Sequence, residues 1–98
     1  MRIIAYRALR DHWEKPGRGD SEGPLSAWFD IAKAAKWNGP PAVKQQFRSA
    51  SFVGERVVFN IAGNKYRLVV WINYSWSTIY VRFIGTHAEY DAIDVEKV

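Results

Sequence analysis

The sequence predicts an α+β domain in which helices come first and an antiparallel sheet follows. Apolar residues recur three to four positions apart in the first part of the chain and at every second position in the last part. Apart from a short strand at the start, strands and helices do not alternate, so a parallel α/β sheet is not expected. The length of 98 residues fits a single domain over residues 1–98.

The first part of the chain is predicted to contain a short strand and two helices. Residues 2–6 combine Ile with aromatic character, as strands do, and residues 7–15 show helical spacing of apolar side chains. After a Pro- and Gly-containing breaker, the apolar face of a second helix recurs over residues 25–35. Pro24 suits its first turn, Ser21 is a candidate cap, and an Asn-Gly-Pro-Pro sequence ends it.

The last part of the chain is predicted to form three strands, at residues 56–61, 65–73 and 78–84. The turns between them are short enough for hairpins, which indicates an antiparallel meander. The N-terminal strand is expected to join it and make a four-stranded sheet. Residues 42–55 form a long, basic connection that can hold a short helical turn, and connections of this length are often functional.

Alternation along the strands assigns their side chains to two faces. The first face is apolar and is expected to form the core under the second helix: Val57, Phe59, Ile61, Tyr66, Leu68, Val70, Ile72, Ile79, Val81 and Phe83. The second face mixes basic and aromatic side chains: Arg56, Val58, Asn60, Lys65, Arg67, Val69, Trp71, Thr78, Tyr80 and Arg82. Cations neutralise phosphates and rings stack on bases, so this second face favours RNA binding over an ordinary solvated surface.

Composition narrows the function further. The net charge of +4 favours polyanionic partners. The chain has no cysteine, which excludes disulfides, thiolate nucleophiles and cysteine zinc sites. No signal peptide or membrane span is predicted, so a cytoplasmic protein is expected. No metal-ligand spacing and no glycine-rich phosphate loop occur, so no metal or cofactor is expected, and His12 is predicted to be a surface residue.

The C-terminal end carries the residues most suited to catalysis. Thr86 and Glu89 have the spacing of a capping box, which would begin a short helix with His87 in its first turn and Tyr90 three residues later. Histidine can transfer protons near neutral pH, and an arginine such as Arg82 can hold a phosphate. Such a set suits RNA cleavage by the substrate's own 2′-hydroxyl without a metal. On spacing alone, a cap with an exposed histidine and a core tyrosine is the preferred interpretation.

Two motifs resemble the HigB family of bacterial toxins, within the RelE-like superfamily. They are Gly63-Asn64-Lys65-Tyr66-Arg67-Leu68 and Thr86-His87-Ala88-Glu89-Tyr90-Asp91. The resemblance also covers the opening Met-Arg-Ile-Ile and the helix that ends near Trp37, and so spans most of the chain. It implies a RelE-like fold, with two N-terminal helices on the sheet and a short C-terminal helix.

The resemblance implies an mRNA interferase, often acting on mRNA in the ribosome. It also implies neutralisation by a helix-turn-helix, HigA-like antitoxin that represses its own operon, so that operator DNA is contacted only through the antitoxin. Family motif positions carry over to the catalytic candidates Arg67, Arg82, His87 and Tyr90. The RNA-binding candidates are Lys33, Lys36, Lys44, Arg48, Asn60, Asn64, Lys65, Trp71 and Tyr80.

Two alternatives to an enzyme remain open at this level. A binding module without catalysis would hold RNA on the basic, aromatic face with a steep salt dependence and leave it intact. A protein-interaction domain would bind its partner without affinity for RNA. The sequence leaves the base preference, the dependence on the ribosome and the separate roles of acid and base open.

Overall fold

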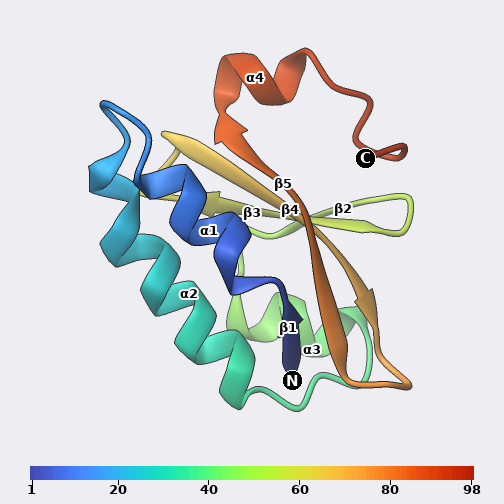
Figure 1. Cartoon of the computed structure of the whole chain (residues 1–98). Helices are drawn as coiled ribbons and strands as arrows, with labels where there is room; N and C mark the ends of the chain where they lie inside the picture. The colour runs from blue at the N-terminus through green and yellow to red at the C-terminus, as the bar shows by residue number, and fades with distance from the viewer.

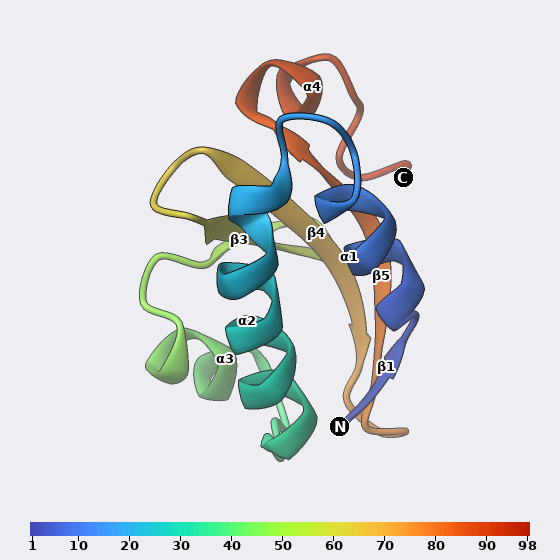
Figure 2. The same cartoon turned by 60° about the vertical axis from the view of Figure 1, so that its left-hand side comes forward.

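The computed structural model describes all 98 residues and confirms the α+β class. Helices α1 and α2 lie side by side on one face of a single sheet, and α4 lies at one end of it (Figures 1 and 2). The elements in chain order are β1 (Arg2–Ile4), α1 (Tyr6–Trp13), the 3-10 turn η1 (Gly19–Ser21), α2 (Glu22–Ala34), α3 (Pro40–Gln46), β2 (Ser51–Val53), β3 (Arg56–Ile61), β4 (Tyr66–Asn73), β5 (Thr78–Thr86) and α4 (His87–Asp91).

The sheet has five strands in the order β1-β5-β4-β3-β2, so the expected count of four was one too low. The central strands form the predicted meander, and β1 joins β5 in parallel. The additional strand, β2, lies in the connection at residues 42–55 and pairs with β3 through a turn at Gly54, whose φ of 57° is left-handed. A strand of three residues is too short to show an alternation of apolar and polar side chains in the sequence, so β2 is recognised only by its pairing with β3.

The core lies between the helical layer and the first face of the sheet. Leu25, Trp28 and Ala32 of α2 are buried, as the helical spacing predicts. They meet β3 and β4, where Trp28 packs edge-on against Phe59 at 5.4 Å between ring centroids. Each fully buried side chain of this size contributes about 1.5–3 kcal/mol, so this layer is the main source of stability. Ser21 precedes α2, but its hydroxyl donates to the carbonyl of Arg18 and does not cap the helix.

One face assignment was wrong because β5 carries a bulge. Val70 pairs with Val81 and Val69 pairs with Phe83, so Arg82 is an extra residue in the ladder. An extra residue reverses the alternation beyond it. Phe83, predicted in the core, therefore lies on the second face with Val69.

The second face is less open than predicted. Val58 and Val69 are buried there, with exposed fractions of 2% and 0%. The segment after α4 turns back toward the β2–β3 turn (Figure 1), and the main-chain oxygen of Val98 accepts hydrogen bonds from side chains of this face. Alternation within strands cannot predict that a distant segment will cover one of the two faces.

His12 is buried, so the prediction of a surface residue was wrong. Its Nδ1 lies 3.0 Å from the Ser21 hydroxyl, which itself donates to the Arg18 carbonyl, so Nδ1 carries the proton. Its ring packs edge-on against Tyr66. Burial, helped by the neighbouring charges of Arg18 and Lys15, lowers the pKa of His12. No helix of the structure is both long and apolar enough to cross a bilayer.

Candidate active site on the second face of the sheet

The short helix α4 begins with the capping box that the sequence predicts. The Thr86 hydroxyl accepts from the Glu89 backbone N–H at 3.2 Å, and the Glu89 carboxylate accepts from the Thr86 N–H at 2.9 Å. The two bonds satisfy donors that a helix N-terminus otherwise leaves unpaired. They fix His87 at the first position of α4, directly after β5.

Arg67, His87 and Tyr90 form one cluster, which we call the arginine–histidine cluster. Arg67 Nε donates to His87 Nε2 at 3.2 Å, and the guanidinium lies 4.8 Å from the centre of the Tyr90 ring. The residues come from β4 and from successive turns of α4. A guanidinium held by a ring and a hydrogen bond keeps its remaining N–H groups free to bind phosphate oxygens.

The hydrogen bond within this cluster defines the tautomer of His87. Because Nε2 accepts from an arginine that never loses its proton, the neutral imidazole carries its hydrogen on Nδ1. Nδ1 makes no hydrogen bond within the chain. The neutral ring therefore presents an N–H at Nδ1 that can donate a hydrogen bond to a substrate.

The structure places Arg82, the fourth catalytic candidate, apart from these three residues. It stands at the bulge of β5, is exposed, and donates from Nε to the main-chain oxygen of Val98 at 3.2 Å. Arg56 donates to the same oxygen from Nε and Nη2, at 3.1 and 2.8 Å. Arg82 and Arg56 therefore form a second cationic group on this face. The sequence missed Arg56 as a site residue, although strand alternation had put it on the correct face.

An ion pair attaches α4 to the loop between α1 and α2. Arg18 donates from both terminal nitrogens to the two oxygens of Glu89, at 2.8 and 3.0 Å. The hydrogen bonds from Arg18, together with that from the Thr86 N–H, lower the pKa of Glu89 from 4.5 to about 2. Gly85 leaves room for this carboxylate, because a Cβ there would come within 2.7 Å of Glu89 Oε1. The sequence missed Arg18, since nothing local links residues 71 positions apart.

The predicted RNA-binding residues do not form one surface. Asn60 pairs with Arg67 across the β3–β4 ladder and so lies beside the arginine–histidine cluster. Asn64 is exposed in the following turn. Lys65 forms an ion pair with Asp20, which also accepts from Tyr66, so the charge of this lysine is already balanced.

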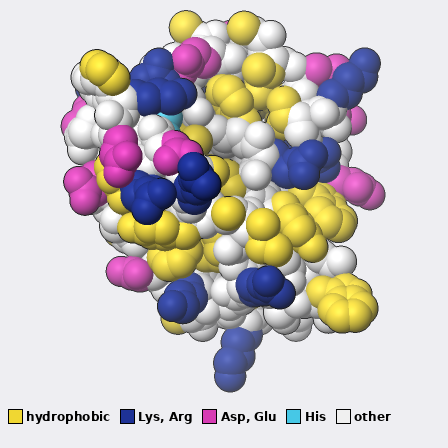
Figure 3. Space-filling view, viewed as in Figure 1, with side chains coloured by type: hydrophobic (Ala, Val, Ile, Leu, Met, Phe, Trp, Pro, Cys, Tyr) yellow, Lys and Arg dark blue, Asp and Glu magenta, His cyan; other side chains and the backbone are white.

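Lys33, Lys36, Lys44 and Arg48 lie away from this cluster. The first two are exposed at the C-terminal end of α2, at the opposite end of the molecule from α4 (Figures 1 and 2). Lys44 belongs to α3, where its ammonium donates to the Ala50 carbonyl at 2.7 Å, and Arg48 follows α3. Figure 3 shows Lys and Arg in separate groups with hydrophobic side chains between them.

Trp71 and Tyr80 are neighbours on adjacent strands of the second face. They pair across β4 and β5, and their rings stack at 5.1 Å with an angle of 25° between planes. Each is half-buried, so the two rings cover part of each other and leave the rest of their aromatic surface accessible. A base can stack on this accessible surface, which makes the pair a candidate stacking platform.

The side chains of the site support acid–base chemistry on a phosphodiester. The cluster supplies an ionisable imidazole and a fixed cation, and Arg82 and Arg56 supply further positive charge on the same face. No three His, Asp or Glu side chains lie close enough to share a metal ion.

Comparisons with known proteins agree with this picture. Residues 21–93 match the HigB_toxin family, described as the RelE-like toxic component of a toxin-antitoxin system. The mRNA interferase toxin HigB of Escherichia coli K12 is 30% identical over 94 residues, which cover 93% of this chain and 88% of the relative. Proteins named mRNA interferase HigB from Escherichia coli O157:H7 and Shigella flexneri match to the same extent.

Proposed function

The chain belongs to the HigB family of RelE-like toxins, and from this membership we propose that it is the toxic component of a toxin–antitoxin system and an endoribonuclease that cleaves mRNA. The observation that carries the chemical part is the contact of Arg67 with both His87 and Tyr90. It joins a proton-transfer group, a fixed cation and a stacking ring at one point on the sheet.

The proposed reaction uses the 2′-hydroxyl of the RNA as the nucleophile. As the bond from the 2′ oxygen to phosphorus forms, the bond to the 5′ oxygen breaks, one proton leaves the 2′ oxygen and one reaches the 5′ oxygen. Arg67 stabilises the charge on the phosphorane, and Arg82, which stands apart from the cluster, adds positive charge from the same face of the sheet. His87 transfers a proton, and Tyr90 holds Arg67 and stacks on the substrate. The separate assignment of acid and base is left to experiment.

The partners follow from the family. An antitoxin neutralises a toxin of this kind, and the substrate is RNA. We further propose that the antitoxin is a HigA-like helix-turn-helix protein, that operator DNA is contacted only through it, and that cleavage takes place on mRNA in the ribosome, in the cytoplasm. A short helix-turn-helix gene beside the toxin gene would support the first of these points.

The test compares His87→Ala and Arg67→Ala with the wild type for RNA cleavage and growth arrest. Loss of a proton-transfer group costs about 10²–10⁴-fold in rate, and loss of a charge-stabilising donor costs about 10²–10³-fold. Arg7→Ala is the matched control, because Arg7 is exposed on α1 and meets only Asp11. Circular dichroism confirms that each variant is folded.

Primer extension after induction maps the cleavage ends for each variant. The proposal requires ends in the wild type and in Arg7→Ala that disappear in the other two variants. If folded His87→Ala and Arg67→Ala keep full toxicity, the site assignment is wrong. Salt-sensitive RNA binding by the wild type without any cleavage, with or without ribosomes, would instead identify a binding module.

A further inference from the structure

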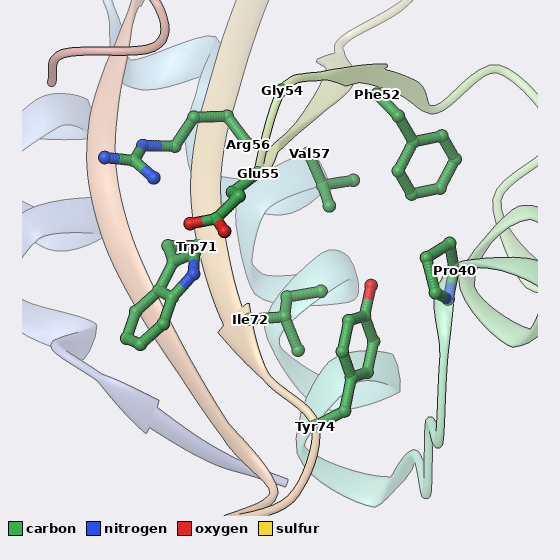
Figure 4. Close-up of a pocket in the computed structure, with 9 residues that line it drawn as sticks. All are labelled: Pro40, Phe52, Gly54, Glu55, Arg56, Val57, Trp71, Ile72 and Tyr74. Atoms are coloured by element: carbon green, nitrogen blue, oxygen red, sulfur yellow. The ribbon is translucent and has the colours of Figure 1, made fainter.

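We propose that the pocket beside the β2–β3 turn binds one unpaired base of the RNA, next to the cleaved nucleotide, and that Glu55 selects bases with an exocyclic amino group. This inference rests on the proposed cleavage of RNA and adds a subsite that the arginine–histidine cluster does not contain. The pocket has a volume of about 310 Å³ and is lined by Pro40, Phe52, Gly54, Glu55, Arg56, Val57, Trp71, Ile72 and Tyr74 (Figure 4).

Aromatic rings supply a large part of the pocket wall. Phe52 is 40% exposed, which is unusual for a phenylalanine on a short edge strand. Trp71, whose ring stacks on Tyr80, also lines the pocket. Tyr74, which follows β4, points its hydroxyl between Ile72 and Pro40 toward Val57 and Phe52 (Figure 4), and burial raises its pKa, so the hydroxyl stays protonated and can donate. Flat, exposed rings around a small pocket suit the faces of a base.

The charges of the pocket favour a base over a phosphate. The Glu55 carboxylate points from the β2–β3 turn toward Trp71 (Figure 4) and makes no hydrogen bond or ion pair within the chain. A carboxylate repels phosphate but accepts hydrogen bonds from an amino group, as it does from N4 of cytosine. The only cation that lines the pocket, Arg56, donates hydrogen bonds to the main-chain oxygen of Val98. An amino-bearing base is therefore a better ligand here than a free anion.

The position of the pocket relates it to the proposed site of cleavage. Trp71 and Arg67 share the second face of β4 and are four residues apart, which corresponds to about 13 Å along a strand. Arg56 borders the pocket, and it and Arg82 donate to the same main-chain oxygen of Val98, so positive charge extends from the pocket toward the arginine–histidine cluster. One RNA strand can follow this row, with its cleaved phosphate at the arginine–histidine cluster and a flanking base in the pocket.

The experiment measures binding and cleavage separately, with Glu55→Gln as the variant and Glu22→Gln as its control. Both changes remove one exposed carboxylate, and Glu22 lies on α2 outside the pocket. Binding is measured with short, fully 2′-O-methylated oligomers of uridine, cytidine or adenosine, which cannot be cleaved through the 2′ oxygen. We expect the wild type and Glu22→Gln to bind the cytidine and adenosine oligomers about fivefold or more tightly than the uridine oligomer, and Glu55→Gln to lose this difference.

Cleavage maps complete the test. Glu55→Gln should still cleave RNA, but its ends should lose a preference for amino-bearing bases at one flanking position. Unchanged base discrimination in folded Glu55→Gln overturns the subsite while leaving the cleavage proposal intact, whereas absence of cleavage by the wild type refutes the cleavage proposal. Equal affinity for cytidine monophosphate and the cytidine oligomer would assign the pocket to free nucleotides. Weaker antitoxin binding by Glu55→Gln with unchanged base discrimination would assign it to a protein interface. Either result overturns the inference.

Discussion

The ion pair between Arg18 and Glu89 should make the stability of this protein fall at acid pH. Its two hydrogen bonds, at 2.8 and 3.0 Å, join α4 to the loop before α2. Glu89→Gln removes the charge but keeps an oxygen that can still accept from the Thr86 N–H. Glu89→Ala removes both the ion pair and the cap.

The expected magnitude follows from the pKa of Glu89, which lies at about 2 instead of 4.5. Without any allowance for solvent, this difference in pKa corresponds to about 3.4 kcal/mol. The Glu89 side chain is 43% exposed, so solvent screens much of the interaction. We therefore expect Glu89→Gln to lower the free energy of unfolding by about 1 kcal/mol at pH 7, and Glu89→Ala by about 2 kcal/mol because the cap is lost as well.

The sign of the pH dependence distinguishes this explanation from a packing effect. A carboxylate whose pKa is lowered by folding stabilises the protein above its unfolded pKa, near 4.5, and loses this contribution as the pH falls toward 2. Urea unfolding at several pH values should show the wild type and Glu89→Gln converging over this window. If the difference between them is the same at pH 7 and at pH 3, the ion pair is not its cause.

Two further predictions concern buried contacts. Gly85→Ala should destabilise the protein by about 1–3 kcal/mol, because the new Cβ would overlap the Glu89 carboxylate. Thermal unfolding measures this loss of stability, and an unchanged Tm would show that the carboxylate moves freely. Burial lowers the pKa of His12, so stability should decline as the pH falls below about 6.5, where the unfolded chain takes up the proton. His12→Gln should remove this decline in urea unfolding at pH 7.5 and 5.5, and a decline that persists would exclude His12 as its source.

Local features of the fold could be predicted from the sequence. The capping box of Thr86 and Glu89 depends on residues three apart, and both of its hydrogen bonds are present. The core positions Phe59, Leu68 and Val70 follow from alternation within uninterrupted strands. Alternation and the family motif together also put Arg67 near His87, because β4 and β5 are joined by a short turn and their pairing is strongly constrained.

Features that depend on distant parts of the chain could not be predicted in this way. The bulge at Arg82 moved Phe83 to the second face, and a ladder irregularity is defined only by the pairing of two strands. His12 looked like a surface residue until the Ser21 hydroxyl and the Tyr66 ring were placed against it.

The sequence by itself determined the α+β class, the meander, the capped helix that carries His87 and the family of the chain. Only the tertiary structure decided that Arg82 stands apart with Arg56, that the segment ending at Val98 returns to the second face, and that a pocket forms beside Glu55. The physical reason is the range of the interactions. Periodicity and caps act over a few residues and leave a pattern in the chain, whereas strand register and burial by a remote segment arise when separate elements pack together.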